Sequence, residues 1–313
     1  MANAIPSQSY VLVIGSAGID SKGRAGGPLT LGTSTPGNVR VSVGGVARNV
    51  ADNLTRLGEQ AVLLSAIGQD GSGKRILNNA AEVGINTEFC IVSDTLHTSA
   101  YLALLDENGN LVMSVDDMRV MACITPKLIE DRRDLIKKAR MVVIDSNLSQ
   151  ESINTVFRCA RRYKVRVCAD PTSTVLAPRL KPHLSRIYMI TPNIAEAQVL
   201  SECTIKSEDD AITAARQLVA RGVEIAMITL AEEGVVYATA NASGHVPAMA
   251  TELVDSTGAS DALTATVVFA LLNDIPIDEA VRLGVSAAAL TLATDETVYP
   301  ELSLDLLYDS LVI

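Results

Sequence analysis

The sequence predicts an α/β fold with three layers, in which a mostly parallel central sheet lies between two layers of helices and a small β-sheet forms a lid. Three observations predict it. Short apolar segments rich in β-branched residues alternate with longer segments of helical periodicity. The apolar segments are continuous, which is typical of parallel strands buried on both faces. Two further regions show strand alternation instead. We expect residues 1–313 to form a single domain, because no segment has the composition of a linker.

The core elements can be assigned in order along the chain. The predicted strands are residues 10–15, 61–67, 141–145, 165–169, 187–191, 225–230 and 235–238. The predicted helices are residues 45–57, 73–82, 126–139, 150–163, 194–200, 208–221, 260–272, 277–294 and 303–311. Because helices separate the strands, we expect the sheet to be parallel and covered on both faces.

Two regions interrupt this alternation. Residues 16–45 are rich in Gly, Ser, Thr and Pro and end in the alternating segment VRVSV at 39–43. Residues 89–118 contain two alternating segments around the turn DENGN at 106–110, which is a hairpin pattern. We interpret both regions as antiparallel strands of a small sheet. Over the strand ends of an α/β core, such a sheet would act as a lid.

Composition and charge narrow the possible partners. The net charge of −10 and the pI of about 4.9 argue against nucleic acid, because a phosphate backbone needs a basic face. No apolar run approaches the ~20 residues of a membrane span, so no membrane partner is expected. The three histidines do not cluster, which disfavours a histidine metal site. The five cysteines are scattered without metal-ligand spacing and predict reduced thiols in a cytoplasmic protein.

One loop carries the strongest functional pattern. The segment DSTGASD at 255–261 runs directly into the apolar segment 262–272, which predicts a buried helix. The N-terminus of that helix would present free backbone N–H groups and the positive end of the helix dipole to an anion such as phosphate. Asp261 would place a carboxylate beside that anion. The same residues are also ordinary capping and turn residues, so the loop alone leaves a purely structural role open.

A second glycine-rich segment is not interpreted as a phosphate-binding loop. Residues 68–75, GQDGSGKR, follow a predicted strand and open a predicted helix. The pattern fails at Arg75, where a Ser or Thr hydroxyl would be needed to bind Mg²⁺. We interpret these glycines as the turn between a strand and a helix.

Five motifs in order resemble the ribokinase-like (PfkB) family of carbohydrate kinases. They are Gly44-Gly45 with Asn49, GQDGSG at 68–73, TPNIAE at 191–196, TLAEEG at 229–234 and DSTGASD at 255–261. The resemblance covers nearly the whole chain and implies the ribokinase-like fold. It also implies ATP-dependent phosphorylation of a small sugar or nucleoside, with ATP and Mg²⁺ as cofactors and K⁺ as a further candidate.

The resemblance also implies a role for each matching position. For catalysis, the implied residues are Asp261 as the general base and Gly258, Ala259 and Ser260, whose N–H groups would hold the transferred phosphoryl oxygens. For substrate binding they are Asp20, Gly44, Gly45 and Asn49. For ATP they are Asn193, Thr229, Gly234 and Gly258. For cations they are Glu196, which would orient Mg²⁺ largely through water, and Asp255 and Thr257 at a monovalent-cation site. A cap or turn role remains open for Asp20, and a capping role remains open for Asn193 and Glu196. Asn49 could instead be an ordinary residue on an exposed helix face.

The choice of substrate rests on three stretches. Residues 43–51, 99–118 and 144–148 resemble the members of the family that phosphorylate pseudouridine at its primary 5′-hydroxyl, and they add Asn147 to the expected substrate contacts. Ribokinase or another sugar kinase of the family is the alternative. A homodimer through the lid is expected, because exposed strand edges need cover.

A different class of function, binding without catalysis, is also open because of Ser260, which stands where the family has glycine. If that position requires a positive φ, or if the Cβ fills the anion site, the chain would be a sugar or nucleoside binder without kinase activity.

Overall fold

The computed structural model describes residues 9–311. Within these residues the main sheet contains β1 (Val11–Ile14), β4 (Ala61–Leu64), β9 (Met141–Asp145), β10 (Arg166–Asp170), β11 (Met189–Ile190), β12 (Ile225–Thr229), β13 (Val235–Thr239) and β14 (Ser243–Val246). Their order is β14-β13-β12-β11-β10-β9-β1-β4. The strands from β12 to β4 are parallel, and β13 and β14 add an antiparallel hairpin at one end.

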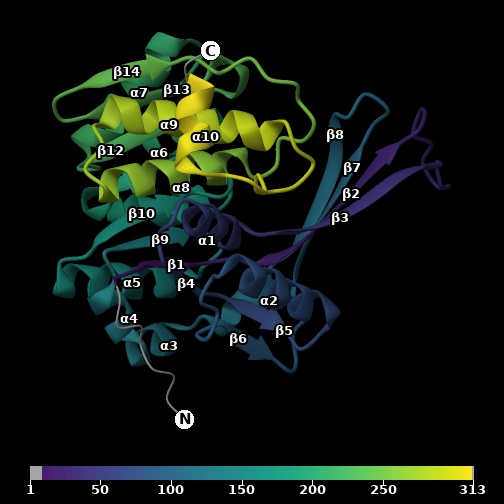
Figure 1. Cartoon of the computed structure of the whole chain (residues 1–313), viewed down its shortest axis with the longest axis horizontal. Helices are drawn as coiled ribbons and strands as arrows, with labels where there is room; N and C mark the ends of the chain where they lie inside the picture. The colour runs from purple at the N-terminus through teal and green to yellow at the C-terminus, as the bar shows by residue number, and fades with distance from the viewer. Residues whose placement is uncertain (1–8, 312–313) are drawn as a thin grey trace.

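Helices cover both faces of the main sheet (Figure 1). One layer contains α3 (Pro126–Asp131), α4 (Arg133–Lys138), α5 (Gln150–Tyr163), α6 (Ile194–Ser201), α7 (Glu208–Ala220) and the 3₁₀ helix Ala177–Arg186. The other contains α1 (Val46–Arg56), α2 (Gly71–Val83), α8 (Ala259–Leu272), α9 (Ile277–Leu292) and α10 (Leu304–Leu311). Short 3₁₀ helices lie at Arg119–Cys123 and Ala231–Glu233. The expected three layers are therefore present.

The strands join these two layers because successive side chains of a strand point to opposite faces. In β1, Leu12 and Ile14 pack into the hydrophobic cluster on one face, whereas Val11 and Val13 pack into the cluster on the other. Helix α8 is apolar on all sides and is buried along most of its length, and it packs against α1 and α9. This burial holds the N-terminus of α8 in a defined position, which matters for the site described below.

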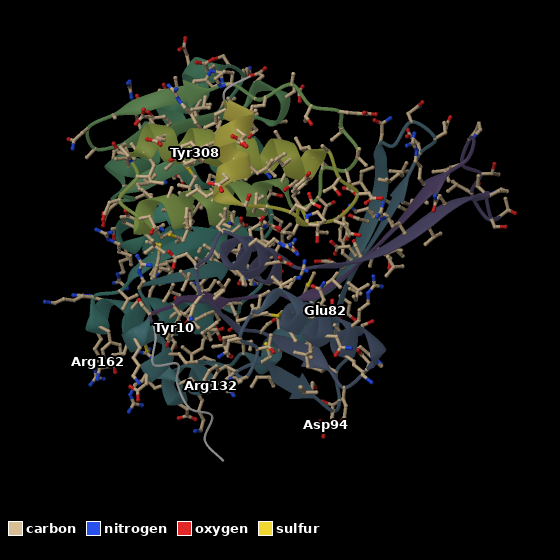
Figure 2. All side chains as sticks on the ribbon, in the orientation of Figure 1. Tyr10, Glu82, Asp94, Arg132, Arg162 and Tyr308 are labelled. Atoms are coloured by element: carbon tan, nitrogen blue, oxygen red, sulfur yellow. The ribbon has the colours of Figure 1, made fainter. Side chains whose placement is uncertain are left out.

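The lid is a second sheet that projects from the body of the molecule (Figure 1). Its strands are β2 (Gly18–Ala25), β3 (Gly37–Gly44), β7 (Ser99–Leu105) and β8 (Leu111–Asp117), in the order β3-β2-β7-β8. Figure 2 shows side chains on both faces of this projecting sheet. A separate pair, β5 (Ala66–Gly68) and β6 (Ile91–Ser93), runs parallel beside the main sheet.

The structure corrects several details of the sequence prediction. The expected strand at 61–67 is divided at Ser65 into β4 and β5, and the expected helix at 126–139 is divided at Arg132, whose guanidinium binds the backbone oxygen of Phe89. The lid strands are not all antiparallel, since β2 and β7 are parallel. Asp20 lies on lid strand β2, within the region expected to form the lid.

Residues 1–8 and 312–313 of the expected domain lie outside the described residues. In the part that is described, no helix combines the length and the apolar character needed to cross a membrane.

Candidate active site

The carboxyl ends of the parallel strands bring the candidate residues to one edge of the main sheet. Ser16 follows β1, Asp145 ends β9, Asp170 ends β10, and Asn193 follows β11. Strand β1 pairs with β4 on one side and with β9 on the other, so the strand order reverses direction here. Ligands of open α/β sheets bind beside such a reversal.

The anion loop, residues 255–261, leads into α8. Its Gly258 is the N-cap of the helix and has a φ of 85°, in the left-handed region. A Cβ at this position would overlap the backbone oxygen of Thr297, so the site requires glycine on two grounds. The helix starts at Ala259, and the N–H groups of its first turn have no intrahelical acceptor. The loop thus presents backbone donors to an anion.

Ser260 does not strain this loop. It is the second residue of α8, its side chain is exposed, and it is not among the described residues with positive φ. Serine is also well tolerated near a helix start. The backbone argument for a chain without kinase activity is therefore not supported.

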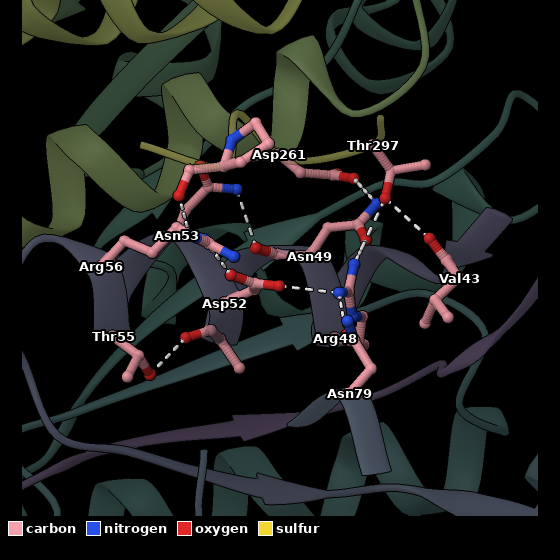
Figure 3. A network of polar contacts seen from close by, with 12 residues as sticks. Val43, Arg48, Asn49, Asp52, Asn53, Thr55, Arg56, Asn79, Asp261 and Thr297 are labelled. Atoms are coloured by element: carbon pink, nitrogen blue, oxygen red, sulfur yellow. Dashed lines mark hydrogen bonds and ion pairs between the residues drawn. The ribbon is translucent and has the colours of Figure 1, made fainter. Parts of the chain in front are cut away.

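Asp261 lies in the first turn of α8 and is held by α1 (Figure 3). The side-chain amide of Asn49 donates to its carboxylate at 2.8 Å. The neighbouring Arg48 in turn donates to the Asn49 oxygen at 2.9 Å and to the Thr297 hydroxyl at 3.2 Å. Arg48 is 4% exposed and pairs with Asp52 at 2.7 Å. A buried ion pair thus orients the amide that orients the predicted base.

The pKa of Asp261 is raised to about 7. Burial is the main cause, because removal from water disfavours the charged carboxylate. The hydrogen bond from Asn49 acts in the opposite direction, while the negative charges of Asp145 and Asp20 raise the pKa further. A carboxyl group with a pKa near neutral suits general base catalysis, since it is deprotonated often enough and still basic enough to accept a proton.

The expected substrate residues Asp20, Gly44 and Gly45 adjoin one another at the base of the lid. A Cβ on Gly44 would overlap the Asp20 carboxylate. Only a glycine at this position leaves room for that carboxylate. Gly45 has a φ of 97° and lies against the backbone of Ser16 and Ala17. Burial is the main cause that raises the pKa of Asp20, and the charge of Lys22 lowers it.

Asn147 joins this group through Ser16. Its amide nitrogen donates to the Ser16 hydroxyl at 3.1 Å, and that hydroxyl donates to the Asp145 carboxylate at 2.8 Å. Asp145 also accepts from the Ser16 and Asn147 backbone N–H groups at 2.6 and 2.9 Å. The structure therefore brings the predicted substrate residues together from β2, the junction of β3 and α1, and the segment after β9.

A mostly apolar pocket of about 910 Å³ opens beside the anion loop. Three of the residues predicted for ATP, Asn193, Thr229 and Gly234, line it. Ser256, Ala259 and Ser260 line its end at the N-terminus of α8, and the other residues that line it include Val235, Met249, Leu253, Leu263, Val285 and Leu292. A polar end beside backbone N–H donors and an apolar remainder suit a nucleotide, with its phosphates at the polar end.

Glu196 forms a capping box at the start of α6. Its carboxylate accepts from the Asn193 backbone N–H, and the Asn193 side chain accepts from the Glu196 N–H, both at 3.0 Å. The capping role that the sequence left open for Asn193 and Glu196 is therefore present in the structure. The role in Mg²⁺ binding stays a prediction, since a capping carboxylate can still hold water molecules of a hydrated ion.

The donor set around Glu196 suits a hydrated Mg²⁺. Asp170 has its pKa raised well above the usual range, first by burial and then by the charges of Asp261, Glu196 and Asp145. The carboxylates of Asp261, Glu196 and Asp145 thus lie close enough to act on Asp170, and a cation among them would offset their repulsion. Among the described residues no group of three such side chains is arranged to hold a metal directly. The arrangement therefore fits an ion bound through water and phosphate oxygens.

The residues expected at the monovalent-cation site contact a side chain instead. The Lys22 ammonium donates to both carboxylate oxygens of Asp255 at 2.6 Å and to the Thr257 hydroxyl. The Thr257 backbone N–H also donates to Asp255, at 2.9 Å. The sequence analysis did not predict this contact, because Lys22 lies more than two hundred residues away on a lid strand.

Four other residues of the site were not predicted from the sequence: Arg48, Asp145, Asp170 and Thr297. Arg48 carried a weak signal, because it is a charged residue next to Asn49 in a predicted helix. Asp145 and Asp170 also carried one, since each is a carboxylate at the end of a predicted parallel strand. Thr297 carried none. Its hydroxyl donates to the Val43 backbone oxygen at 2.7 Å, and only the folded chain brings these segments together.

Known proteins match this sequence and this fold over nearly the whole chain. The model of the pfkB family carbohydrate kinases matches residues 8–303. The pseudouridine kinase of Escherichia coli is 30% identical over 298 residues, which cover 95% of this chain and 95% of that protein. The ribokinase of Haemophilus influenzae is 27% identical over 262 residues, with 83% and 84% covered.

Solved structures agree on the fold. The ribokinase of Arabidopsis thaliana, solved with ribose and ATP, superimposes with a TM-score of 0.83 at 18% identity and covers 96% of this chain and 98% of its own. The ribokinase-like architecture is therefore shared at low sequence identity. The family match spans the main sheet, the lid and the anion loop alike, and it makes this chain a member of the PfkB family of carbohydrate kinases, an ATP-dependent kinase of sugars or nucleosides.

Proposed function

We propose that this kinase transfers the γ-phosphoryl group of ATP to the primary 5′-hydroxyl of pseudouridine, yielding pseudouridine 5′-phosphate. One observation supports the proposed position of phosphoryl transfer. A carboxyl group with a pKa of about 7, Asp261, lies between the expected substrate residues and the polar end of the nucleotide pocket. At that point a hydroxyl can lose a proton as it attacks a phosphate.

The proposed step assigns distinct tasks to the residues of the site. The Asp261 carboxylate accepts the proton of the 5′-hydroxyl as the 5′-oxygen forms its bond to the γ-phosphorus, and the bond between that phosphorus and the bridging oxygen of ADP breaks. The backbone N–H groups from Gly258 to Asp261 stabilise the charge on the transferred group. Asn49 orients the base, and Asp20 accepts hydrogen bonds from the ribose hydroxyls.

The nucleotide is proposed to occupy the 910 Å³ pocket, with its phosphates toward α8. Thr229 and Gly234 would line the nucleoside part, and Asn193 would lie near the phosphates. When bound, Mg²⁺ would neutralise the triphosphate charge, held through water by Glu196 beside Asp170. This role is supported by the charge of Glu196, which together with Asp261 and Asp145 raises the pKa of Asp170 and would be offset by a cation.

The choice of pseudouridine rests on two observations. A relative that is 30% identical over nearly the full length is a pseudouridine kinase. In addition, the amide nitrogen of Asn147 is engaged by Ser16, which leaves its carbonyl oxygen as a candidate acceptor for a base N–H. Pseudouridine carries one more ring N–H than uridine because its glycosidic bond is made through carbon.

The substrate is tested by measuring ADP formation with pseudouridine, uridine, ribose and 5′-deoxypseudouridine, with the product identified by mass spectrometry. We expect the largest kcat/KM with pseudouridine and no turnover with the 5′-deoxy analogue. The Asn147→Ala variant should raise the KM for pseudouridine and leave that for ribose nearly unchanged. If ribose is the better substrate and Asn147→Ala changes nothing, the assignment to pseudouridine is wrong.

Free ribose is the second candidate, favoured by the likeness to a ribokinase at 27% identity. The Asp20 and Asn49 side chains would serve a ribose ring in either case. The same assay separates the two, because a ribokinase would release ribose 5-phosphate and would not need a base contact at Asn147.

The base is tested with Asp261→Ala. A positioned general base contributes about 10²- to 10⁴-fold to turnover, so we expect kcat to fall by that factor. The nucleotide pocket does not include Asp261, so ATP affinity measured by calorimetry should be nearly unchanged. Turnover equal to that of the unmodified protein would exclude Asp261 as the base. Absent turnover of every substrate in the unmodified protein, with sugar binding retained, would instead favour a binder.

We also propose that two copies associate through the outer face of the lid. The strand register places Val39, Val41, Leu102, Met113 and Val115 on one face, opposite to the face of Asp20. These five side chains are 43–72% exposed. A contiguous apolar sheet face of this kind is typical of an interface, and covering it with a second copy would remove it from water.

A further inference from the structure

We propose that Lys22 serves as a built-in monovalent cation of the anion loop and thereby couples closure of the lid to phosphoryl transfer. The proposal extends the function proposed above, on which it rests. Its basis is the geometry of a single ammonium group that joins two parts of the site from opposite ends of the chain.

The ammonium of Lys22 has the surroundings of a bound cation. Its nitrogen contacts both Asp255 oxygens at 2.6 Å and also the Thr257 hydroxyl. The side chains of Lys22 and Asp255 are only 13% and 19% exposed. Burial by itself would raise the pKa of Asp255, but the hydrogen bonds from Lys22 and from the Thr257 N–H outweigh it and lower that pKa. The carboxylate is thus charged and already neutralised by the protein.

These contacts lie at the start of the loop that holds the transferred phosphoryl group. Asp255 accepts from the backbone of Thr257, which immediately precedes Gly258, the N-cap of α8. Lys22 therefore fixes the turn whose next residues supply the N–H donors. Since its ammonium already occupies the space between Asp255 and Thr257, the two residues do not fit a separate K⁺ ion at that place.

The same side chain belongs to the lid. Lys22 and Asp20 are two residues apart on β2, so both point to the inner face of the lid sheet. Arg40, the cross-strand partner of Lys22 on β3, also points inward and pairs with Asp295 and Glu296. The inner face of the lid thus carries cations that meet carboxylates of the core. With Asp20 on the substrate and Lys22 on the loop, one strand would order both reactants together.

The first test compares the unmodified protein with Lys22→Met, which keeps the length of the side chain and removes its charge. The activity of the unmodified protein in a buffer whose only monovalent cation is tetramethylammonium should equal its activity after addition of about 0.1 M K⁺, which is close to physiological ionic strength. Lys22→Met should lose kcat by about ten- to a hundredfold, the range for a charge-assisted hydrogen bond. Added K⁺, NH₄⁺ or methylammonium should restore part of it, because they can refill the vacated position.

A second measurement does not depend on turnover. Hydrogen exchange should be faster in Lys22→Met at the amides of residues 253–258 and of β2, and unchanged in α5. This readout stands even if the substrate assignment fails. Arg24→Met is the matched control, since it removes a cation from the same strand whose contact is with the Glu107 backbone oxygen near the lid tip. It should leave both turnover and exchange of the anion loop unchanged.

Several results would overturn the proposal. They are a requirement of the unmodified protein for K⁺, a Lys22→Met variant with full kcat in the tetramethylammonium buffer, or a loss of activity that no small cation restores. Unchanged exchange at residues 253–258 would equally exclude the coupling between lid and loop. A failure of the kinase assay alone, with the exchange pattern as expected, would count against the proposed function and not against the contact of Lys22.

Discussion

Asp261 illustrates how a single residue is adapted to its task at a cost in stability. Burial raises the pKa of its carboxyl group to about 7, and the hydrogen bond from Asn49 keeps the rise from being larger. A charged carboxylate in this position is thus destabilised relative to water, which is the condition that makes it a better base.

The pH profile follows from this value. The base must be deprotonated to act, so kcat/KM, which reports groups of the free enzyme, should rise with pH and level off above about 7. The measurement is kcat/KM for the preferred substrate between pH 5.5 and 9 at constant ionic strength. A profile that is flat down to pH 5.5 would mean that Asp261 does not control the step.

The stability of the fold should respond to the same group with a definite sign. The pKa of Asp261 is about 7 in the folded chain and 3.8 for a carboxyl group in water. The folded state therefore holds a proton that the unfolded chain has lost, and it becomes less stable as pH rises from about 4 to 7. Asp261→Asn removes that cost. At pH 8 the variant should be more stable than the unmodified protein by an amount on the order of a few kcal/mol, measured by urea unfolding.

Asp70 provides the control of opposite sign. It is the N-cap of α2, and burial, which would raise its pKa, is outweighed by hydrogen bonds from Thr98 and Gly73 that lower it to about 2. Its charge therefore stabilises the folded state above pH 4 and loses this effect as pH falls toward 2. Asp70→Asn should destabilise at pH 8 by about 1 kcal/mol, less than the shift alone implies because water screens this partly exposed carboxylate. If both substitutions changed the free energy of unfolding at pH 8 in the same direction, this explanation would be wrong.

At the scale of the element, the anion loop depends on its one left-handed residue. Gly258→Ala would force a Cβ into the Thr297 backbone oxygen at a φ of 85°. We expect a loss of more than about 2 kcal/mol of stability together with weaker ATP binding, since the start of α8 must shift. Urea unfolding and calorimetry measure the two effects.

Gly71→Ala is the matched control for that substitution. Gly71 is the first residue of α2, its Cβ would meet nothing within 4 Å, and its φ is not positive. The same chemical change should therefore be neutral or slightly stabilising. A comparable loss at both glycines would show that the position in the anion loop has no special requirement.

At the scale of the whole molecule, the outer face of the lid predicts the oligomeric state. Leu102→Lys places a charge at the centre of the proposed apolar interface, where burial would be costly. We expect the unmodified protein to sediment as a dimer and Leu102→Lys as a monomer in analytical ultracentrifugation. Val92→Lys, at a valine that is 52% exposed on β6 outside the lid, should not change the oligomeric state. A monomeric unmodified protein would exclude the interface.

Local patterns were enough to predict much of this fold. The alternation of apolar and helical segments located every parallel strand of the main sheet, because burial on both faces requires continuous apolar residues. The prediction missed β14, whose sequence SGHV carries no strand pattern. It also missed the parallel pairing of β2 and β7, because pairing between distant segments leaves no local signal.

The sequence by itself determined the layers, the anion loop and the identity of the residues expected in the site, since each depends on residue type and spacing along the chain. The tertiary structure alone decided which of them interact. It joined Arg48 to Thr297, Asn49 to Asp261 and Lys22 to Asp255 across more than two hundred residues. It also set the pKa of Asp261 near neutral. Burial and charge depend on neighbours in space, and only the folded chain supplies them.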